Sequence, residues 1–139
     1  MKNKKMKEKL KILIIDDEKD SLELIKDELE YNNCRVYTAA SGKEGVEKAR
    51  ELVPDLITLD IQMPGMDGFE VMRELKNDSR TSGIPVIIIT VCDTKGEMTK
   101  GMLLGARDYI VKPFSIKTLI DDIKSSISFY KVVSAAKTL

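Results

Sequence analysis

The sequence of 139 residues contains no histidine and no tryptophan, and it has only two cysteines. Without histidine the chain has no Ser-His-Asp triad, no histidine metal ligand and no phosphohistidine of its own, so any such chemistry needs a partner. Cys34 and Cys92 each lie within or beside an apolar run. They predict no disulfide framework and favour a reducing compartment, the cytoplasm.

Long apolar runs and nucleotide-binding glycine patterns are also missing. No apolar run approaches the roughly 20 residues that cross a bilayer, so we expect no membrane association. The N-terminus is rich in lysine but lacks the apolar region of a signal peptide. Neither a Walker motif nor a dinucleotide fingerprint is present, which leaves nucleotide binding poorly supported.

The composition, 42% hydrophobic and 33% charged, is that of a single globular domain. The 23 basic and 23 acidic residues balance, but residues 1–11 hold six lysines and one glutamate, so the rest of the chain is net acidic. Direct nucleic-acid binding by an acidic domain is disfavoured. We predict a basic extension over 1–9, a domain over 10–130, and a tail or the end of the last helix over 131–139.

Short apolar runs alternate with amphipathic stretches, which indicates an α/β fold with a parallel sheet. Five strands are expected at 11–15, 34–38, 56–59, 86–89 and 108–111. Helices are expected at 20–31, after the capping-box pair Ser41 and Glu44, through Lys76, over 93–104, and from Ser115. Within 93–104, Gly96 and Gly101 each cost roughly 1 kcal/mol relative to alanine, so this helix is predicted to be the loosest.

The last helix has an apolar stripe that begins just after its expected cap. Its apolar positions alternate in spacings of four and three, at Ile116, Ile120, Ile123, Ile127 and Tyr130. The helix could continue to about Val133 and pair with another helix, or these residues could be a frayed tail.

Polar residues follow four of the predicted strands: Asp16 and Asp17, Asp60, Thr90 and Lys112. In an open parallel sheet the ligand crevice lies outside the carboxyl ends of the strands, so these side chains are expected to converge. Each one alone is more often a turn residue, a helix cap or a solvated lysine. Four strands ending this way at one edge are hard to obtain from capping alone.

Three carboxylates in one pocket raise one another's pKa unless a cation joins them. A hard ion such as Mg²⁺ or Mn²⁺ suits a site with only oxygen ligands. Asp60 stands alone before a loop with proline and glycine and is the best candidate for a nucleophile, whereas Asp16 and Asp17 are paired like metal ligands. Lys112 would supply a positive charge to phosphoryl oxygens and Thr90 a hydroxyl donor.

Four segments carry a resemblance to a known family: IIDDE, LITLDIQMPGMDGFE, IIIT and GARDYIVKPF. Together and in this order, within residues 10–128, they resemble the receiver domains of response regulators (CheY-like) from two-component signalling systems. The resemblance implies a doubly wound five-stranded parallel sheet in the order 2-1-3-4-5. It also implies a signalling domain that promotes its own phosphorylation and dephosphorylation, and not an enzyme with a separate substrate.

The resemblance assigns roles to the strand-end residues. It implies that Asp60 is the phosphoacceptor, that Asp16 and Asp17 form the acidic pair that binds magnesium with Asp60, and that the Gln62 backbone carbonyl is a further metal ligand. Lys112 is the phosphate-binding lysine, and relatives commonly have a cis peptide bond at the position of Lys112–Pro113.

The resemblance also implies a switch. Thr90 would turn toward a bound phosphoryl group and leave room for Tyr109 to move inward. Helix 93–104, the fifth strand and the last helix would then present an altered face to a downstream protein or to a second copy. The phosphoryl donor would be a sensor histidine kinase or a histidine phosphotransfer protein.

The sequence departs from the family at the residue after the switch threonine. That residue is commonly small, but here it is Val91, whose bulk narrows access to the phosphoryl group. Gln62 and Cys92 occupy positions that tune hydrolysis in relatives, and neither carries a charge here. We therefore hypothesise a long-lived acyl phosphate.

Three other functions remain open at this stage. A phosphatase or phosphotransferase with an aspartyl nucleophile would want a second acid two residues on, where this chain has Gln62. A flavodoxin-like cofactor binder would want a phosphate loop after the first strand, where two acids stand. A degenerate receiver that acts only as a protein-interaction module is disfavoured by the complete acidic set.

Overall fold

The computed structural model describes the backbone of residues 9–138 and the side chains of residues 9–127. The strands are β1 (Lys11–Ile15), β2 (Arg35–Ala39), β3 (Leu56–Leu59), β4 (Val86–Thr90) and β5 (Asp108–Val111). The helices are α2 (Lys19–Tyr31), α3 (Gly42–Leu52), α4 (Gly68–Lys76), α5 (Lys95–Leu103) and α6 (Ile116–Thr138). Within this part of the chain no helix is both long and apolar enough to cross a membrane.

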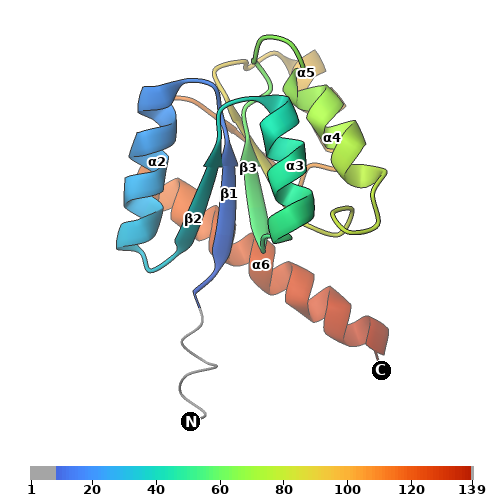
Figure 1. The fold of residues 1–139 in the computed structure, drawn as a ribbon. Coiled ribbons are helices and arrows are strands. Elements are labelled where there is room, and N and C mark those ends of the chain that lie inside the picture. Colours follow the sequence, from blue (N-terminus) through green and yellow to red (C-terminus); the bar gives the residue numbers. More distant parts are fainter. Residues whose placement is uncertain (1–8, 139) are drawn as a thin grey trace.

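All strand pairs are parallel, and the sheet order is β2-β1-β3-β4-β5 (Figure 1). This confirms the predicted α/β fold and its order 2-1-3-4-5. The three central strands are almost fully buried and consist mostly of apolar residues, as expected when helices cover both faces of a sheet. The edge strands β2 and β5 keep partly exposed side chains.

The hydrophobic core has two parts, one on each face of the sheet. On one face, α3 and α4 pack on alternate residues of β1, β3 and β4, with Leu13, Ile57 and Ile88 among the buried side chains. On the other face, α2 and α6 cover the intervening residues, such as Ile12 and Ile87. The two clusters use opposite sides of the same strands, which fixes the strand register.

Side chains cap several helices, and the predicted capping box of Ser41 and Glu44 is confirmed. Ser41 Oγ accepts the Glu44 N–H at 3.2 Å, and Glu44 Oε1 accepts the Ala40 N–H at 2.8 Å. Asp67 caps α4 by accepting the Glu70 N–H at 3.0 Å. These bonds satisfy amide groups that have no partner within the helix.

Several boundaries differ by one or two residues from the sequence prediction, and two of these differences have a local cause. Helix α5 begins at Lys95 and not at Asp93, because Thr94 Oγ1 accepts the Glu97 N–H at 3.3 Å and so marks the cap. Cys34 lies one residue before β2, where its N–H donates to Leu29 of α2 at 3.0 Å. Both differences are local effects of capping at helix ends.

Gly101 has a role that the sequence analysis did not identify. A Cβ atom at this position would lie 2.7 Å from Ile88 Cδ1 and 3.3 Å from the Tyr109 ring. Glycine therefore lets α5 approach β4 and β5 closely. The helix stability that glycine costs is accompanied by closer packing of α5 on the sheet. At Gly96 a Cβ would meet nothing within 4 Å. The prediction that α5 is the loosest helix stays a prediction.

The buried stripe of α6 contains a residue that the sequence analysis missed. Leu119, Ile123 and Ile127 are buried, whereas Ile116 and Ile120 are only partly buried. Ser115 Oγ caps this helix by accepting the Thr118 N–H at 3.1 Å. The helix continues to Thr138. The predicted core position Tyr130 and the pairing stripe near Val133 lie outside the residues whose side chains are described.

The difference in burial between neighbouring residues of α6 predicts a difference in stability. Leu119→Ala should lower the free energy of unfolding by about 2–5 kcal/mol, because Leu119 is 0% exposed and its loss leaves a cavity. Ile120→Ala should cost less than about 2 kcal/mol, because Ile120 keeps contact with water. Urea unfolding of both variants measures this. Equal losses would contradict the observed orientation of α6.

Candidate functional site

The carboxyl ends of the inner strands and of β5 meet at one edge of the sheet. Asp16 directly follows β1, Asp60 follows β3, Thr90 ends β4, and Lys112 follows β5. Backbone bonds extend the sheet pairing into this edge: Asp60 N–H donates to Ile15 O at 3.0 Å, and Lys112 N–H donates to Thr90 O at 2.8 Å. The main chain at the site is therefore held as firmly as the strands themselves.

The Lys112 side chain joins two carboxylates that come from distant parts of the sequence. Its Nζ lies 2.9 Å from Asp16 Oδ2 and 3.2 Å from Asp60 Oδ2. Asp16 is 3% exposed and Asp60 8% exposed, so both charges lie away from bulk water. A buried charge of this kind needs a partner of opposite sign, and one ammonium group serves both carboxylates.

Electrostatics keep this lysine charged. Burial by itself lowers the pKa of Lys112, but the hydrogen bond and charge of Asp16, followed by those of Asp60, outweigh it and raise the pKa overall. The ammonium form therefore persists throughout the physiological range. A fixed positive charge stands beside the carboxylate that the sequence predicts as the nucleophile.

The second oxygen of each carboxylate binds the local backbone. Asp60 Oδ1 accepts the Gln62 N–H at 2.9 Å, and Asp16 Oδ1 accepts the Glu18 N–H at 2.9 Å. Each side chain thus bonds to the turn that follows its strand with one oxygen and to Lys112 with the other. Both carboxylates are oriented before any ligand arrives.

A glycine holds the loop after Asp60 in place. The Gly68 N–H donates to Ile61 O at 3.1 Å, and a Cβ at position 68 would lie 2.4 Å from Ile61 Cα. Only glycine fits where the start of α4 turns back against the end of β3. The sequence indicates a loop with proline and glycine after Asp60, but this backbone contact could not be predicted from it.

The structure brings together only part of the predicted acidic set. Asp16 and Asp60 share Lys112, whereas Asp17 is exposed. Among residues 9–138 no three Asp, Glu, Cys or His side chains are grouped as metal ligands. The donors at Asp16 and Asp60 are nevertheless oxygen atoms already gathered around one positive charge, which is the chemistry that a hard divalent ion requires. Metal ligation by Asp17 and by the Gln62 carbonyl stays a prediction.

Thr90 and Tyr109 both bind the backbone of Cys92. Thr90 is fully buried, and its Oγ1 accepts the Cys92 N–H at 3.4 Å. The half-buried Tyr109 donates its hydroxyl to Cys92 O at 2.7 Å. Burial first, and then the nearby Cys92, raise the pKa of Tyr109 to about 12, so its hydroxyl stays a donor at neutral pH. Both side chains were identified from the sequence, but not that both bind the Cys92 backbone.

Val91 and Gln62 are exposed residues next to the buried groups of the site. Val91, 60% exposed, follows the buried Thr90 directly, and Gln62 is also exposed. The Lys112–Pro113 peptide bond is cis, as the resemblance implies. No histidine contributes to the site, because the chain has none.

Comparison with known proteins gives consistent matches. PilH of Pseudomonas aeruginosa is 39% identical over 118 residues, which are 85% of this chain and 98% of PilH. The response regulator PleD of Caulobacter vibrioides is 37% identical over 123 residues, 88% of this chain but 27% of PleD. A solved receiver domain from Clostridium thermocellum is 33% identical with a TM-score of 0.83, covering 89% of this chain and 98% of that one.

The family match covers the parts of the chain that build the site. Residues 12–124 match the response regulator receiver domain, a span from β1 into α6 that contains Asp16, Asp60, Thr90 and Lys112. The sheet order β2-β1-β3-β4-β5 agrees with this match. The chain therefore belongs to the response regulator receiver domain family of two-component signal transduction.

Proposed function

We propose that this receiver domain accepts a phosphoryl group on Asp60 from a phosphohistidine of a sensor histidine kinase or a histidine phosphotransfer protein. The observation that supports this most directly is the Lys112 ammonium, which contacts both Asp16 and Asp60. A carboxylate at this position has a positive charge beside it before the phosphoryl group arrives. Preorganised charge of this kind lowers the barrier for phosphoryl transfer.

In the transfer step an Asp60 carboxylate oxygen attacks phosphorus. The phosphorus–nitrogen bond of the donor breaks, the imidazole leaves, and an acyl phosphate forms on Asp60. The backbone N–H of Gln62 keeps the carboxylate oriented through Oδ1. Lys112 stays close to the new phosphoryl oxygens, and the Thr90 hydroxyl supplies a further donor.

The proposed cofactor is Mg²⁺, with Mn²⁺ as a substitute. Asp16 and Asp60 would hold it, with Asp17 and the Gln62 backbone carbonyl as further ligands. When bound, the ion neutralises negative charge on the phosphoryl oxygens. The chain's own contribution is to gather carboxylates that would otherwise repel one another at the edge of the sheet.

The response to phosphorylation is proposed to pass through Cys92. A Thr90 hydroxyl that turns toward the phosphoryl group gives up the Cys92 N–H, and Cys92, whose carbonyl binds the Tyr109 hydroxyl, is then free to shift. Tyr109 belongs to β5, so the change reaches the face formed by α5, β5 and α6. That face would bind a downstream protein or a second copy of the chain.

The alternative functions fit the site less well. A degenerate receiver would keep the fold without the paired carboxylates and lysine, but all three are present and in contact. A phosphatase or phosphotransferase with an aspartyl nucleophile would need an acid where Gln62 stands. Hydrolysis of a small phosphoester such as p-nitrophenyl phosphate would favour that alternative.

Asp60→Asn should abolish phosphorylation. Incubation with acetyl phosphate and Mg²⁺ should add one phosphoryl group to the wild-type chain, seen by intact mass, and none to the variant, because an amide cannot act as the nucleophile. Asp55→Asn is the matched control, since Asp55 is exposed just before the same strand, and it should be labelled normally. Labelling of the Asp60 variant would contradict the assignment.

Removal of divalent ions should stop phosphorylation of the wild-type protein. An excess of EDTA is expected to abolish labelling by acetyl phosphate, and added Mg²⁺ or Mn²⁺ to restore it. The ion neutralises negative charge of the carboxylates and the phosphoryl group that the single Lys112 ammonium leaves uncompensated. Asp16→Asn should raise the Mg²⁺ concentration needed for half-maximal labelling. Labelling at full rate in EDTA would refute the proposed cofactor.

The acyl phosphate is expected to be long-lived, because Val91 narrows access of water to the site. Val91→Ala should shorten the half-life of the acyl phosphate at least about threefold, because even a small loss of shielding from water lowers the barrier to hydrolysis enough for such a change. Val53→Ala, which changes an exposed valine outside the site, is the control and should have no effect. A half-life of seconds in the wild type, measured by loss of the phosphorylated mass, would reject the hypothesis.

A further inference from the structure

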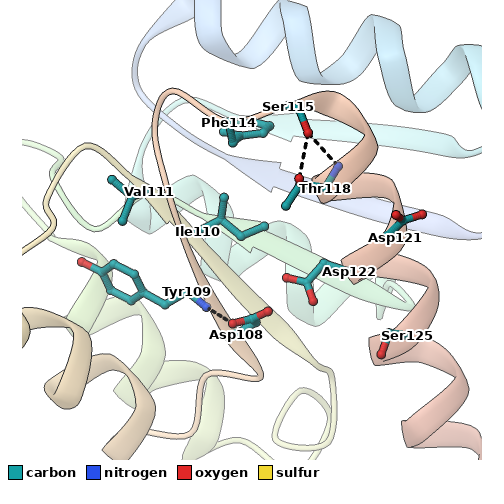
Figure 2. Close-up of a pocket in the computed structure, with 10 residues that line it drawn as sticks. All are labelled: Asp108, Tyr109, Ile110, Val111, Phe114, Ser115, Thr118, Asp121, Asp122 and Ser125. Carbon is teal, nitrogen blue, oxygen red and sulfur yellow. Dashed lines mark hydrogen bonds between the residues drawn. The ribbon is translucent and has the colours of Figure 1, made fainter.

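An acidic groove that is separate from the Asp60 site runs along β5 and α6 (Figure 2). Asp108 lines it from β5, and Asp121 and Asp122 line it from α6. Figure 2 shows the Asp108 and Asp122 side chains directed toward each other across the groove, while Asp121 points away from them. Two carboxyl groups from different elements thus meet where α6 packs on the edge of the sheet.

The two side chains are directed toward each other, and a hydrogen bond shared between them, which raises the pKa of Asp122, would need a proton. A carboxylate can only accept, so one member of the pair must be protonated to donate. Asp108 Oδ1 already accepts the Tyr109 N–H at 2.7 Å, so Asp108 is placed as the acceptor of the pair. The shared proton therefore belongs to Asp122.

Other charged groups lie near the pair on each neighbouring element. Arg107, just before β5, favours ionisation of Asp122. On α6, Asp121 is paired with Lys117 at 2.7 Å, and both of these side chains are largely exposed. From α5, Lys95 lines an adjoining groove together with Asp108. Burial of Asp122 comes first among the causes that raise its pKa, to about 7, and the contact with Asp108 comes second.

We propose that Asp108 and Asp122 form a proton-sharing latch between β5 and α6, closed when Asp122 is protonated and released when it ionises. In the closed form Asp122 donates to Asp108 and ties the helix to the edge strand. In the released form two carboxylates face each other, and their repulsion weakens that contact. The latch does not depend on phosphorylation. Its effect on output, through Tyr109 next to Asp108, rests on the proposed function.

Direct titration tests the latch on the unphosphorylated protein without a phosphoryl donor or divalent ion, so failure would leave the role of Asp60 untouched. The side-chain carboxyl carbons of Asp121 and Asp122 are followed by NMR as pH is raised. Asp122 should titrate near neutrality, and Asp121, which points away from the pair, is the internal reference. In Asp108→Asn the Asp122 midpoint should fall, because its acceptor is no longer charged. An unchanged midpoint would overturn the latch.

Stability gives a second readout with a definite sign. The pKa of Asp122 is raised on folding, so the stabilisation it provides is present at low pH and is lost as pH rises through about 7. Between about pH 6 and 8 the unfolding equilibrium constant should rise by roughly 3- to 10-fold more for the wild type than for Asp122→Asn, after allowance for solvent screening. Asp121→Asn should keep the wild-type pH dependence. The same dependence in Asp122→Asn would refute the proposal.

Discussion

The structure of the site depends on one ammonium group shared by two buried carboxylates. Asp16 and Asp60 stand at the ends of adjacent parallel strands, where their negative charges would repel each other. Lys112, which follows the edge strand β5, supplies the compensating positive charge. Removal of the lysine would leave two uncompensated charges, and removal of either carboxylate would alter the environment of the other two groups. The same arrangement suits a phosphoryl group, whose negative charge also needs positive neighbours.

The sheet fixes these charges in position because its backbone contacts continue up to the site. Asp60 N–H bonds to Ile15 O, Lys112 N–H bonds to Thr90 O, and Gly68 lets α4 turn back directly against Ile61. These are contacts of the main chain, so they depend little on the rotamers of surface residues. Chemistry that requires placement within a fraction of an ångström is therefore supported by the most rigid part of the fold.

Much of this arrangement could be predicted from the sequence. The strands and the polar residues at their ends are visible in short stretches of sequence, and the sheet topology determines which strand ends lie together. The apolar runs identify the strands, and the rule that parallel strands end at one edge brings Asp16, Asp60 and Lys112 together. Contacts between particular atoms could not be predicted in this way. Helical spacing gave Ile120 the place that Leu119 occupies, and the glycine at 101 was interpreted as a weakness because its closeness to Ile88 is a tertiary feature.

Strand β5 and Lys112, the residue after it, connect the site at Asp16 and Asp60 with the pair Asp108 and Asp122. Lys112 follows the strand at the carboxyl edge of the sheet, and Asp108 begins it beside α6. Tyr109 bonds to Asp108 through its N–H and to Cys92 through its hydroxyl. As an edge strand, β5 pairs only with β4, so its displacement breaks fewer contacts than displacement of a central strand would. Phosphorylation of Asp60 and ionisation of Asp122 would therefore act on the same movable element from opposite ends, and by thermodynamic linkage each would change the free energy of the other.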